Sequence, residues 1–291
     1  MRHIDLHSHS TVSDGTLSPT ELVSHAGGAG VAMLALTDHD DIGGLEALGA
    51  AARAQGVVPV NGVEVSVTWG SRTLHVVGLR FDAADATLCA GLARLRAGRV
   101  ERALRIAAEL TRHGIAGSFE GARAQAREEV IGRTHFARFL VERGHAPDMK
   151  TVFRKFLTEG RPGYVKHQWA GLGEAVAWIT GAGGIAVLAH PGRYDLGKTK
   201  MDVLLDEFVE AGGRALEVVC GSHSPEMNRQ VARLARQRGL LASCGSDYHG
   251  PGQGYVAMGR LPPLPVDTTP VWHDWPEAAG LERGPALATA A

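Results

Sequence analysis

The chain begins with the stretch His3-Ile4-Asp5-Leu6-His7-Ser8-His9-Ser10, and this stretch decides the fold. Its first residues alternate between apolar and polar, which is the pattern of a short strand. His7 and His9 follow at the strand's end, and both imidazoles face the same way because side chains on a strand repeat with period two. With the carboxylate of Asp14 a short loop away, they can begin a metal site. Taken alone, the same pair could equally be two surface histidines.

The composition sets limits on the class of protein. The 291 residues are 44% hydrophobic and 21% charged, which is enough for one large domain or for a domain with an insertion. The net charge of −1 provides no global basic field to attract nucleic acid. Three widely spaced cysteines predict reduced thiols rather than disulfides. We expect a soluble cytoplasmic protein, because we find no signal-peptide pattern and no apolar run of membrane-spanning length.

Short apolar runs typical of buried strands alternate along the chain with segments of helical character. Beyond the first strand, the expected strands cover residues 31–36, 57–60, 63–65, 73–81, 185–189, 215–219 and 240–244. The expected helices cover residues 19–28, 41–55, 173–180, 201–211 and 225–238. Ser18 and Glu21 form a capping box at the start of the first helix. This alternation predicts parallel strands with crossover helices, and about seven strands favour a βα barrel over an open sheet.

Residues 84 to about 164 interrupt the alternation and contain no strand pattern. They read as a long helix over 88–113 and two shorter helices over 134–143 and 151–157. We therefore predict a barrel domain made of residues 1–98 and 165–262, with a helical insertion of residues 99–164 that could cover the site as a lid. Residues 263–291 are rich in Pro and Ala and are expected to form a loosely packed C-terminal extension. The long helix carries regularly spaced arginines, which predict a solvated helix face, at positions 94, 96, 99, 102 and 105.

Potential metal ligands lie within or directly after almost every expected strand. In parallel βα folds the C-terminal ends of the strands form the site. Imidazoles and carboxylates together suit Mn²⁺, Fe²⁺ or Zn²⁺. Nine candidates are too many for one ion, and neighbouring ions can stabilise the attacking and leaving oxygens of a phosphoryl transfer. The candidates are His7, His9, Asp14, His39, Glu64, His75, His190, Asp247 and His249.

Five ordered motifs give the chain a resemblance to a known family. They are His7-Ser8-His9, Thr37-Asp38-His39-Asp40, Gly62-Val63-Glu64, Leu188-Ala189-His190-Pro191 and Gly245-Ser246-Asp247-Tyr248-His249. On these motifs the chain resembles the polymerase and histidinol phosphatase (PHP) family over nearly its whole length outside the insertion and the tail. The resemblance implies a distorted seven-stranded βα barrel that holds three divalent metal ions. Mn²⁺ is the first expectation, with Fe²⁺ or Zn²⁺ as alternatives.

The same resemblance divides the nine candidates among three metal positions. The first would be held by His7, His9, Glu64 and Asp247. The second would be held by Glu64, His75 and His190, so that Glu64 bridges two ions. The third would be held by Asp14, His39 and His249. Some relatives have histidine where this chain has Asp14, and a carboxylate there keeps a ligand while adding negative charge.

The segment Gly132-Arg133-Thr134-His135-Phe136-Ala137, within the helical insertion, resembles one branch of the family. That branch contains 3′,5′-nucleotide bisphosphate phosphatases and ribonuclease AM, which trims RNA from its 5′ end by the same chemistry. The resemblance implies removal of the 3′-phosphate from a pAp-like nucleotide, which gives AMP and phosphate. Short 5′-phosphorylated RNA is the alternative substrate. We expect neither a membrane nor a stable protein as a partner.

The expected mechanism is in-line attack on the 3′ phosphorus by a metal-bridging hydroxide that Glu64 helps to hold. Basic groups outside the metal shell would bind the substrate's phosphates, with one hydroxyl donor among them. These groups are Arg133, His135, Lys166, Arg193 and His223, with Ser222 as the hydroxyl donor. His223 or His135 could give a proton to the leaving 3′ oxygen. Arg99 is not part of this set, since its place on a helix face accounts for it.

Three other functions remain open from the sequence. A histidinol phosphate phosphatase would need a site for an imidazole and an amine, whereas the Arg and His residues of the insertion favour a doubly phosphorylated ligand. A non-catalytic module is disfavoured by the complete ligand set. A simple RNA-binding protein is disfavoured by the net charge and by the absence of an aromatic and basic strand pattern.

Overall fold

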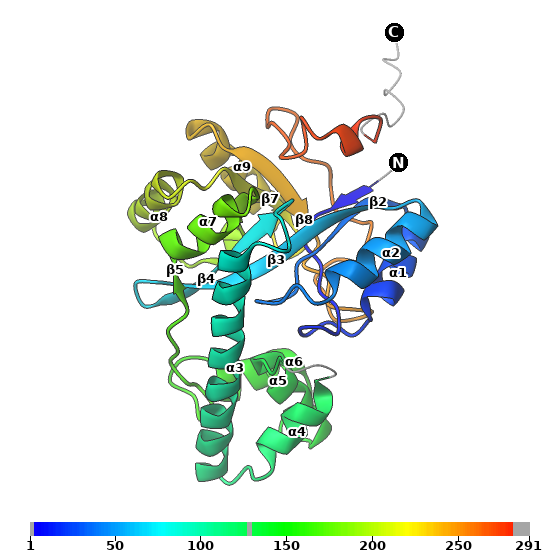
Figure 1. Cartoon of the computed structure of the whole chain (residues 1–291). Coiled ribbons are helices and arrows are strands. Elements are labelled where there is room, and N and C mark those ends of the chain that lie inside the picture. Colours follow the sequence, from blue (N-terminus) through cyan, green and yellow to red (C-terminus); the bar gives the residue numbers. More distant parts are fainter. Residues whose placement is uncertain (1–2, 127–129, 282–291) are drawn as a thin grey trace.

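The computed structural model describes residues 3–126 and 130–281, and its central feature is a barrel-like sheet (Figure 1). Seven strands follow one another around this sheet in the order β1-β2-β3-β4-β6-β7-β8. Leu6 N donates to Cys244 O at 3.0 Å, and Asp247 N donates to His7 O at 2.9 Å. These bonds join the first and last strands, so the sheet is nearly closed. The expected distorted seven-stranded βα barrel is confirmed.

Most strands have six residues or fewer, whereas β3 has 12 and β4 has 8. The strands are β1 His3–Asp5, β2 Val31–Leu36, β3 Val58–Trp69, β4 Arg72–Leu79, β5 Ala170–Gly171, β6 Ile185–Leu188, β7 Ala215–Cys220 and β8 Leu241–Gly245. The two-residue strand β5 pairs with β3 outside the main path. The helices are α1 Pro19–Gly28, α2 Leu45–Gln55, α3 Ala86–Arg112, α4 Ser118–Gln125, α5 Arg133–Glu142, α6 Met149–Val152, α7 Leu172–Gly181, α8 Lys198–Glu210 and α9 Pro225–Gln237. Short helical turns complete the set, with η1 at Phe153–Leu157, η2 at Pro191–Arg193 and η3 at Pro276–Ala278.

Helix α1 begins as its sequence predicts. Ser18 caps it, and the Glu21 carboxylate accepts a hydrogen bond from the Ser18 backbone N–H at 2.8 Å. The predicted helix from residue 41 instead begins at Leu45. The reason is local, because Asp41 Oδ1 accepts a hydrogen bond from Gly43 N–H at 2.8 Å and holds a turn there.

Strands β3 and β4 depart from the parallel order that the sequence predicts. Residues 57–60 and 63–65 were expected as two strands, but residues 58–69 form the single strand β3. Gly70 and Ser71 then turn the chain so that Trp69 pairs with Arg72, and β4 runs antiparallel to both β3 and β6. A two-residue turn joins antiparallel strands only. Because β4 is reversed, its first half, which carries His75, lies at the barrel end where the parallel strands finish.

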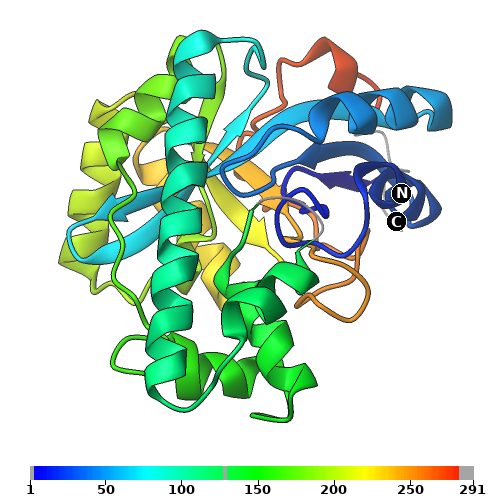
Figure 2. The same cartoon turned by 60° about the horizontal axis from the view of Figure 1, so that its bottom comes forward.

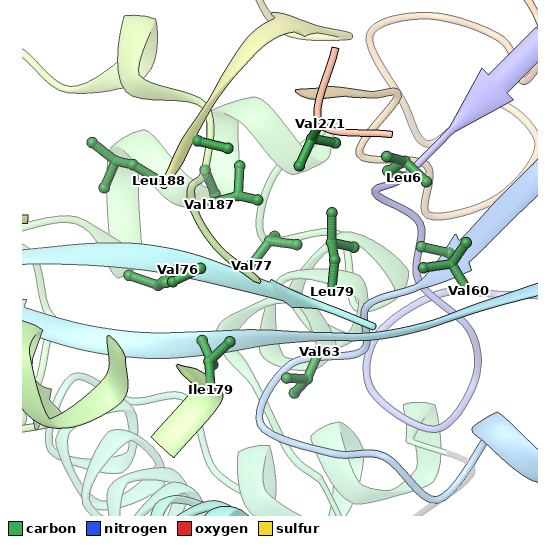
Figure 3. Close-up of a cluster of buried hydrophobic side chains, with 14 of the residues drawn as sticks. Leu6, Val60, Val63, Val76, Val77, Leu79, Ile179, Val187, Leu188 and Val271 are labelled. Carbon is green, nitrogen blue, oxygen red and sulfur yellow. The ribbon is translucent and has the colours of Figure 1, made fainter. Parts of the chain in front are cut away.

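Aliphatic side chains from the strands, from α7 and from the C-terminal segment meet in one core (Figure 3). Val271, Trp272 and Trp275 are buried in this core, and Val271 N donates to Ala242 O of β8 at 2.8 Å. The expectation of a loosely packed extension from residue 263 is therefore wrong for residues 270–281. Its Pro and Ala content obscured a few large apolar side chains, each worth about 2 kcal/mol when buried. Residues 282–291 lie outside the described residues.

Helices α4, α5 and α6 lie below the barrel in Figure 1, and they enclose a second hydrophobic cluster with the far half of α3. The first half of α3 packs on the barrel through Leu88, Leu92 and Leu95, whereas Ile106 and Leu110 pack among α4, α5 and α6. Figure 2 shows these helices beside the open end of the barrel, near the N-terminal loop. The described residues between 84 and 164 form no strand, as predicted. Within the described chain, no helix is both long and apolar enough to cross a membrane.

Candidate active site

Glu64 lies at the centre of a cluster of histidines at one end of the barrel. Its side chain is buried, and its atom Oε1 lies 2.8 Å from His75 Nδ1 and 3.0 Å from His190 Nε2. Its other oxygen, Oε2, lies 2.9 Å from His39 Nδ1. The three histidines come from β4, from the turn after β6 and from the loop after β2. One carboxylate thus joins side chains from separate strands of the barrel.

The remaining candidate ligands complete the cluster on the other side of this glutamate. His7 Nε2 and His9 Nε2 each lie 3.3 Å from its Oε2. Asp247 Oδ1 lies 3.3 Å from His9 Nε2 and 3.6 Å from His7 Nε2. Asp14 Oδ1 lies 3.2 Å from His249 Nε2. The structure therefore brings all nine candidate residues together.

The cluster contains three groups whose ligand atoms lie within 4.8 Å of one another. They are His7, His9, Glu64 and Asp247; His9, Asp14, His39 and His249; and His39, Glu64 and His75. The first matches the first expected set, and the second adds His9 to the expected third set. In the last group, His39 stands beside Glu64 and His75. His190 Nε2, expected there, lies 3.4 Å from His75 Nδ1.

Several buried polar atoms converge in this cluster and make no hydrogen bond of acceptable geometry among the described residues, although His39 Nδ1 and Glu64 Oε2 lie 2.9 Å apart. They are His7 Nε2, His9 Nε2, Asp14 Oδ1, His39 Nδ1 and Glu64 Oε2. A buried polar atom without a partner is costly and uncommon in a folded protein. Imidazole nitrogens and carboxylate oxygens are also the ligands that Mn²⁺, Fe²⁺ and Zn²⁺ accept. The residues present therefore fit divalent metal ions.

The electrostatics of the cluster keep its carboxylates ionised. Burial alone would raise the pKa of Glu64, but His75, His7 and His39 outweigh it and hold this pKa well below its usual range. Burial likewise opposes ionisation of Asp14, and His249 and His39 lower its pKa well below the ordinary value. Burial lowers the pKa of His39 to about 4, whereas the nearby carboxylates outweigh burial at His7 and His9 and raise their pKa values, that of His9 to about 10, so metal binding would displace protons from these rings. Ionised carboxylates and neutral imidazoles are the forms that bind metal.

The backbone is distorted at three strand ends that serve the cluster. Asp40, His190 and Asp247 have φ values of 54°, 32° and 54°. Such left-handed conformations cost a non-glycine residue about 1–3 kcal/mol each and persist where the surrounding structure holds them. Gly245 is required for a different reason, because a Cβ there would lie 2.1 Å from the Cβ of His7. The ends of the strands are thus shaped around the ligand side chains.

Glu217 is a site residue that the sequence analysis missed. It lies in β7, and its Oε1 is 2.8 Å from His7 Nδ1 while its Oε2 accepts the His190 backbone N–H at 2.6 Å. A buried carboxylate in this position fixes the His7 proton on Nδ1 and leaves Nε2 free to face the cluster. The signal was present, because Glu217 interrupts an apolar strand just as Glu64 does.

Arg99 also differs from its expected place on a solvated helix face. Its side chain is only 7% exposed, and its Nε donates to Asp40 Oδ2 at 2.7 Å. A second donor, Nη2, bonds to Ser66 Oγ at 2.8 Å. Of the five arginines on this face, Arg94 and Arg105 are exposed as predicted. Asp40 is fully buried, so Arg99 acts as the partner of a buried charge between α3 and the barrel.

A pocket lined by cations lies beside the cluster, between α3, the start of α5 and the β3–β4 hairpin. Its lining includes Arg72, Arg102, Arg133 and Lys166, and no described lining residue is acidic. Burial, followed by the charges of Arg133 and Arg99, lowers the pKa of Arg102 to about 9. Arg102 Nε has no hydrogen-bond partner among the described residues. Uncompensated positive charge of this kind is suited to binding an anion.

Arg193 contacts the cluster directly, and its Nη1 lies 3.1 Å from Asp247 Oδ2. Ser222 follows strand β7 in the sequence, and its Oγ lies 3.3 Å from Cys220 Sγ. The structure thus places Arg193 at the cluster, and Arg133 and Lys166 in the lining of the cationic pocket. It gives Ser222 a local partner instead.

Neither candidate acid is arranged to release a proton. Burial lowers the pKa of His135 to about 4, and its Nδ1 accepts the Gly132 N–H at 3.0 Å. His223 Nε2 accepts the Gly192 N–H at 3.0 Å, and its Nδ1 lies 3.4 Å from the carbonyl oxygen of Val218. Both rings are engaged with backbone groups. The expectation that one of them is the general acid is therefore not supported by these contacts.

Three comparisons identify relatives of this chain. A 3′,5′-nucleoside bisphosphate phosphatase of Chromobacterium violaceum is 52% identical over 94% of this chain and 96% of that protein. A 5′-3′ exoribonuclease of Escherichia coli, Rnm, is 42% identical over 93% of each chain. The solved structure of an amidohydrolase from C. violaceum with bound sulfate superposes with a TM-score of 0.90 at 52% identity, covering 92% of this chain and 94% of that chain.

The model of the PHP domain family matches residues 5–218, a span that contains seven of the nine clustered residues and the whole of strands β2 to β6. The cluster that fits metal ions lies at the C-terminal ends of the strands, and the relatives match this chain over nearly their full length. This chain belongs to the PHP domain family.

Proposed function

We propose that this protein is a metal-dependent phosphatase that removes the 3′-phosphate of 3′,5′-nucleotide bisphosphates such as pAp. The products are a 5′-mononucleotide and phosphate. One observation carries the proposal: the cluster around Glu64 lies beside a separate pocket of uncompensated cations. Two adjacent anion sites of this kind suit a substrate with two phosphates, and the named relative from C. violaceum supports that substrate class.

We propose that the cluster holds three divalent ions, with Mn²⁺ as the first expectation. The first would be held by His7, His9, Glu64 and Asp247, the second by Glu64, His75 and His190, and the third by Asp14, His39 and His249, with His9 and His39 close enough to be shared. When bound, such ions neutralise phosphate oxygens and lower the pKa of water at the site. The chain's own groups then position the substrate.

The cationic pocket is proposed to hold the 5′-phosphate. Arg133 belongs to the helical insertion at the start of α5, and Lys166 lies on the segment that returns to the barrel. Arg133 is half-buried, and burial followed by the charge of Arg99 lowers its pKa, so an incoming anion would relieve this repulsion. Arg193, which already contacts Asp247, is placed to bind an oxygen of the 3′-phosphate. The insertion therefore contributes to the site rather than only covering it.

The test is phosphate release by the Mn²⁺-loaded protein from pAp, 3′-AMP, 5′-AMP and histidinol phosphate at equal concentration. We expect rapid release from pAp, much slower release from 3′-AMP and none from 5′-AMP. Equal rates with pAp and 3′-AMP would contradict the role of the 5′-phosphate. Hydrolysis of 5′-AMP or of histidinol phosphate in preference to pAp would contradict the proposed reaction.

Replacing Arg133 with glutamine should lower kcat/KM for pAp by about 10- to 100-fold, because a charge-assisted hydrogen bond contributes roughly 1.5–3 kcal/mol. The rate with 3′-AMP, which has no 5′-phosphate, should fall far less. Steady-state kinetics with both substrates measure the difference. Arg112→Gln is the matched control, since Arg112 lies exposed at the far end of α3. A parallel fall with both substrates would show that Arg133 does not bind the 5′-phosphate.

Replacing Glu217 with glutamine should weaken metal binding by about 10- to 100-fold. Glutamine presents an NH₂ group that cannot accept both the His7 Nδ1–H and the His190 N–H, so the His7 proton can move to Nε2 and block that ligand atom. Calorimetric titration of the metal-free protein with Mn²⁺ measures the change. Glu210→Gln, on the exposed end of α8, serves as the control. Unchanged affinity in the Glu217 variant would mean that this carboxylate does not position His7.

Exoribonuclease activity on short 5′-phosphorylated RNA is a second candidate. Its support is a cleft beside Asp14, lined by side chains of the N-terminal loop, the insertion and the loop after β8. These include Thr11, Thr16, Gln125, His135, Arg138 and Gln253. A chain of nucleotides could leave the site through this cleft, and the relative from E. coli is named for that activity.

A further inference from the structure

Tyr255 is an exposed aromatic residue on the loop that follows the last two candidate ligands of the chain. Its side chain is 71% exposed. The other exposed large apolar residues of the described chain are aliphatic: Val100, Leu104, Val203, Val209 and Val266. The proposed reaction assigns no role to this exposed ring, and tyrosine rings are common where proteins bind ligands because they combine an apolar face with a polar tip.

Arg193 connects this ring to the candidate active site. Its Nη1 lies 3.1 Å from Asp247 Oδ2, and its guanidinium carbon lies 5.9 Å from the centroid of the Tyr255 ring. The distance is within the range of a cation–π contact. A single side chain therefore spans the gap between a cluster carboxylate and the exposed ring, which places Tyr255 at the mouth of the site.

The loop that carries Tyr255 is held at several points. Gln253 Oε1 accepts a hydrogen bond from Arg138 at 3.0 Å, and Arg138 also donates to Asp14 O at 2.6 Å. Gly250, at φ +131°, lies so close to Thr16 that no Cβ would fit there. The loop is thus tied to the insertion and to the N-terminal loop. It presents the Tyr255 ring from a defined position.

We propose that the Tyr255 ring binds one face of the nucleobase of the substrate, with Arg193 beside it. This inference rests on the proposed function, because it names how the same site recognises a nucleotide rather than any bisphosphate. Stacking on an aromatic ring uses the π face that every base has. Tyr255 therefore sets the preference for a nucleotide over a base-free sugar bisphosphate and does not choose among bases.

The kinetic test compares pAp with a base-free analogue, 1-deoxyribose 3,5-bisphosphate, in wild type and in Tyr255→Leu. We expect the wild type to prefer pAp, and the variant to lose most of that preference. The loss should appear as an increase in KM for pAp of about tenfold or more, since stacking one base is a substantial fraction of nucleotide affinity. The value of kcat should stay within about twofold, because the ring does not touch the reacting phosphorus.

Tyr255→Phe is the matched variant, because it keeps the π face and removes only the hydroxyl. It should retain the preference for pAp. A thermal melt of each variant checks that the exposed substitution leaves the fold intact. An unchanged KM for pAp in Tyr255→Leu, or an equal rise in KM for both compounds, would overturn the proposal, and the second result would indicate that Tyr255 acts only by placing Arg193.

A binding experiment separates this inference from the proposed reaction. Calorimetry should show that Tyr255→Leu weakens binding of AMP to the Mn²⁺-loaded protein by about tenfold, with little effect on ribose 5-phosphate. If the wild type does not hydrolyse pAp, the proposed function fails, yet the AMP comparison still decides whether Tyr255 binds a base. An equal loss of affinity for AMP and for ribose 5-phosphate, or no loss of affinity for either ligand, would contradict the base-binding role.

Discussion

Replacing Glu64 with glutamine is expected to lower phosphate release from pAp by about three orders of magnitude or more. Glu64 lies within 3.3 Å of five histidines, and it supplies the negative charge at the centre of the cluster. Glutamine has nearly the same shape but no charge, and its NH₂ group would face nitrogen ligands. Loss of the stabilisation that bound metal gives to a phosphoryl transition state is worth several kcal/mol, and each 1.36 kcal/mol is about tenfold in rate.

Two measurements check this prediction. The first is kcat/KM for pAp with saturating Mn²⁺, and the second is the metal content after dialysis at a fixed free Mn²⁺ concentration. Both should fall in Glu64→Gln, and neither should change in Glu210→Gln, whose side chain is exposed on the outer surface of α8. Full metal content with full activity would show that Glu64 is not a shared ligand.

The second large effect concerns stability rather than turnover. Replacing Arg99 with methionine should lower the free energy of unfolding by about 3–5 kcal/mol, because it leaves the fully buried Asp40 carboxylate without its cationic partner. Among the described residues, the Asp40 carboxylate would then keep only the Ser66 backbone N–H, which donates to its Oδ1 at 2.6 Å. Urea unfolding followed by circular dichroism measures the change.

A double-mutant cycle tests the cause of this effect. Removing both charges, in Asp40→Asn with Arg99→Met, should recover part of the lost stability, since a neutral pair leaves no uncompensated buried ion. Arg94→Met is the control on the same helix, because its ion pair with Glu174 is exposed and worth at most about 1 kcal/mol. If Arg99→Met is no more destabilising than Arg94→Met, the buried pair does not hold α3 to the barrel.

Much of the barrel could be predicted because its elements carry local signals. The six apolar residues of β2 and the capping box of α1 occur where the sequence places them. The reversal of β4 could not be inferred from alternation of strands and helices. Its signal was the short turn at Gly70 and Ser71 between β-rich segments, which specifies a hairpin and not a crossover. The C-terminal packing of Val271 and the tryptophans depends on tertiary contacts that composition does not report.

The sequence likewise predicted some residues of the candidate site and not others. Histidines and acids that follow strands are visible as motifs, so all nine clustered residues could be named from the sequence. Glu217 was missed because, unlike Glu64, it belongs to none of the five motifs and acts through His7. Arg99 was wrongly predicted to be solvated, because helical spacing shows which residues share a helix face but not what packs against that face. Its partner, Asp40, is 59 residues away in the chain.

The central claim is tested most directly by a competition between two substrates. The Mn²⁺-loaded protein is given pAp and a short 5′-phosphorylated RNA at equal concentration, and release of phosphate and of nucleotides is followed together. A bisphosphate phosphatase releases phosphate from pAp at least about tenfold faster than it releases nucleotides from RNA, a difference of about 1.4 kcal/mol in transition-state free energy. Release of nucleotides from RNA at a comparable or higher rate, or no reaction with either substrate while metal is bound, would contradict the account.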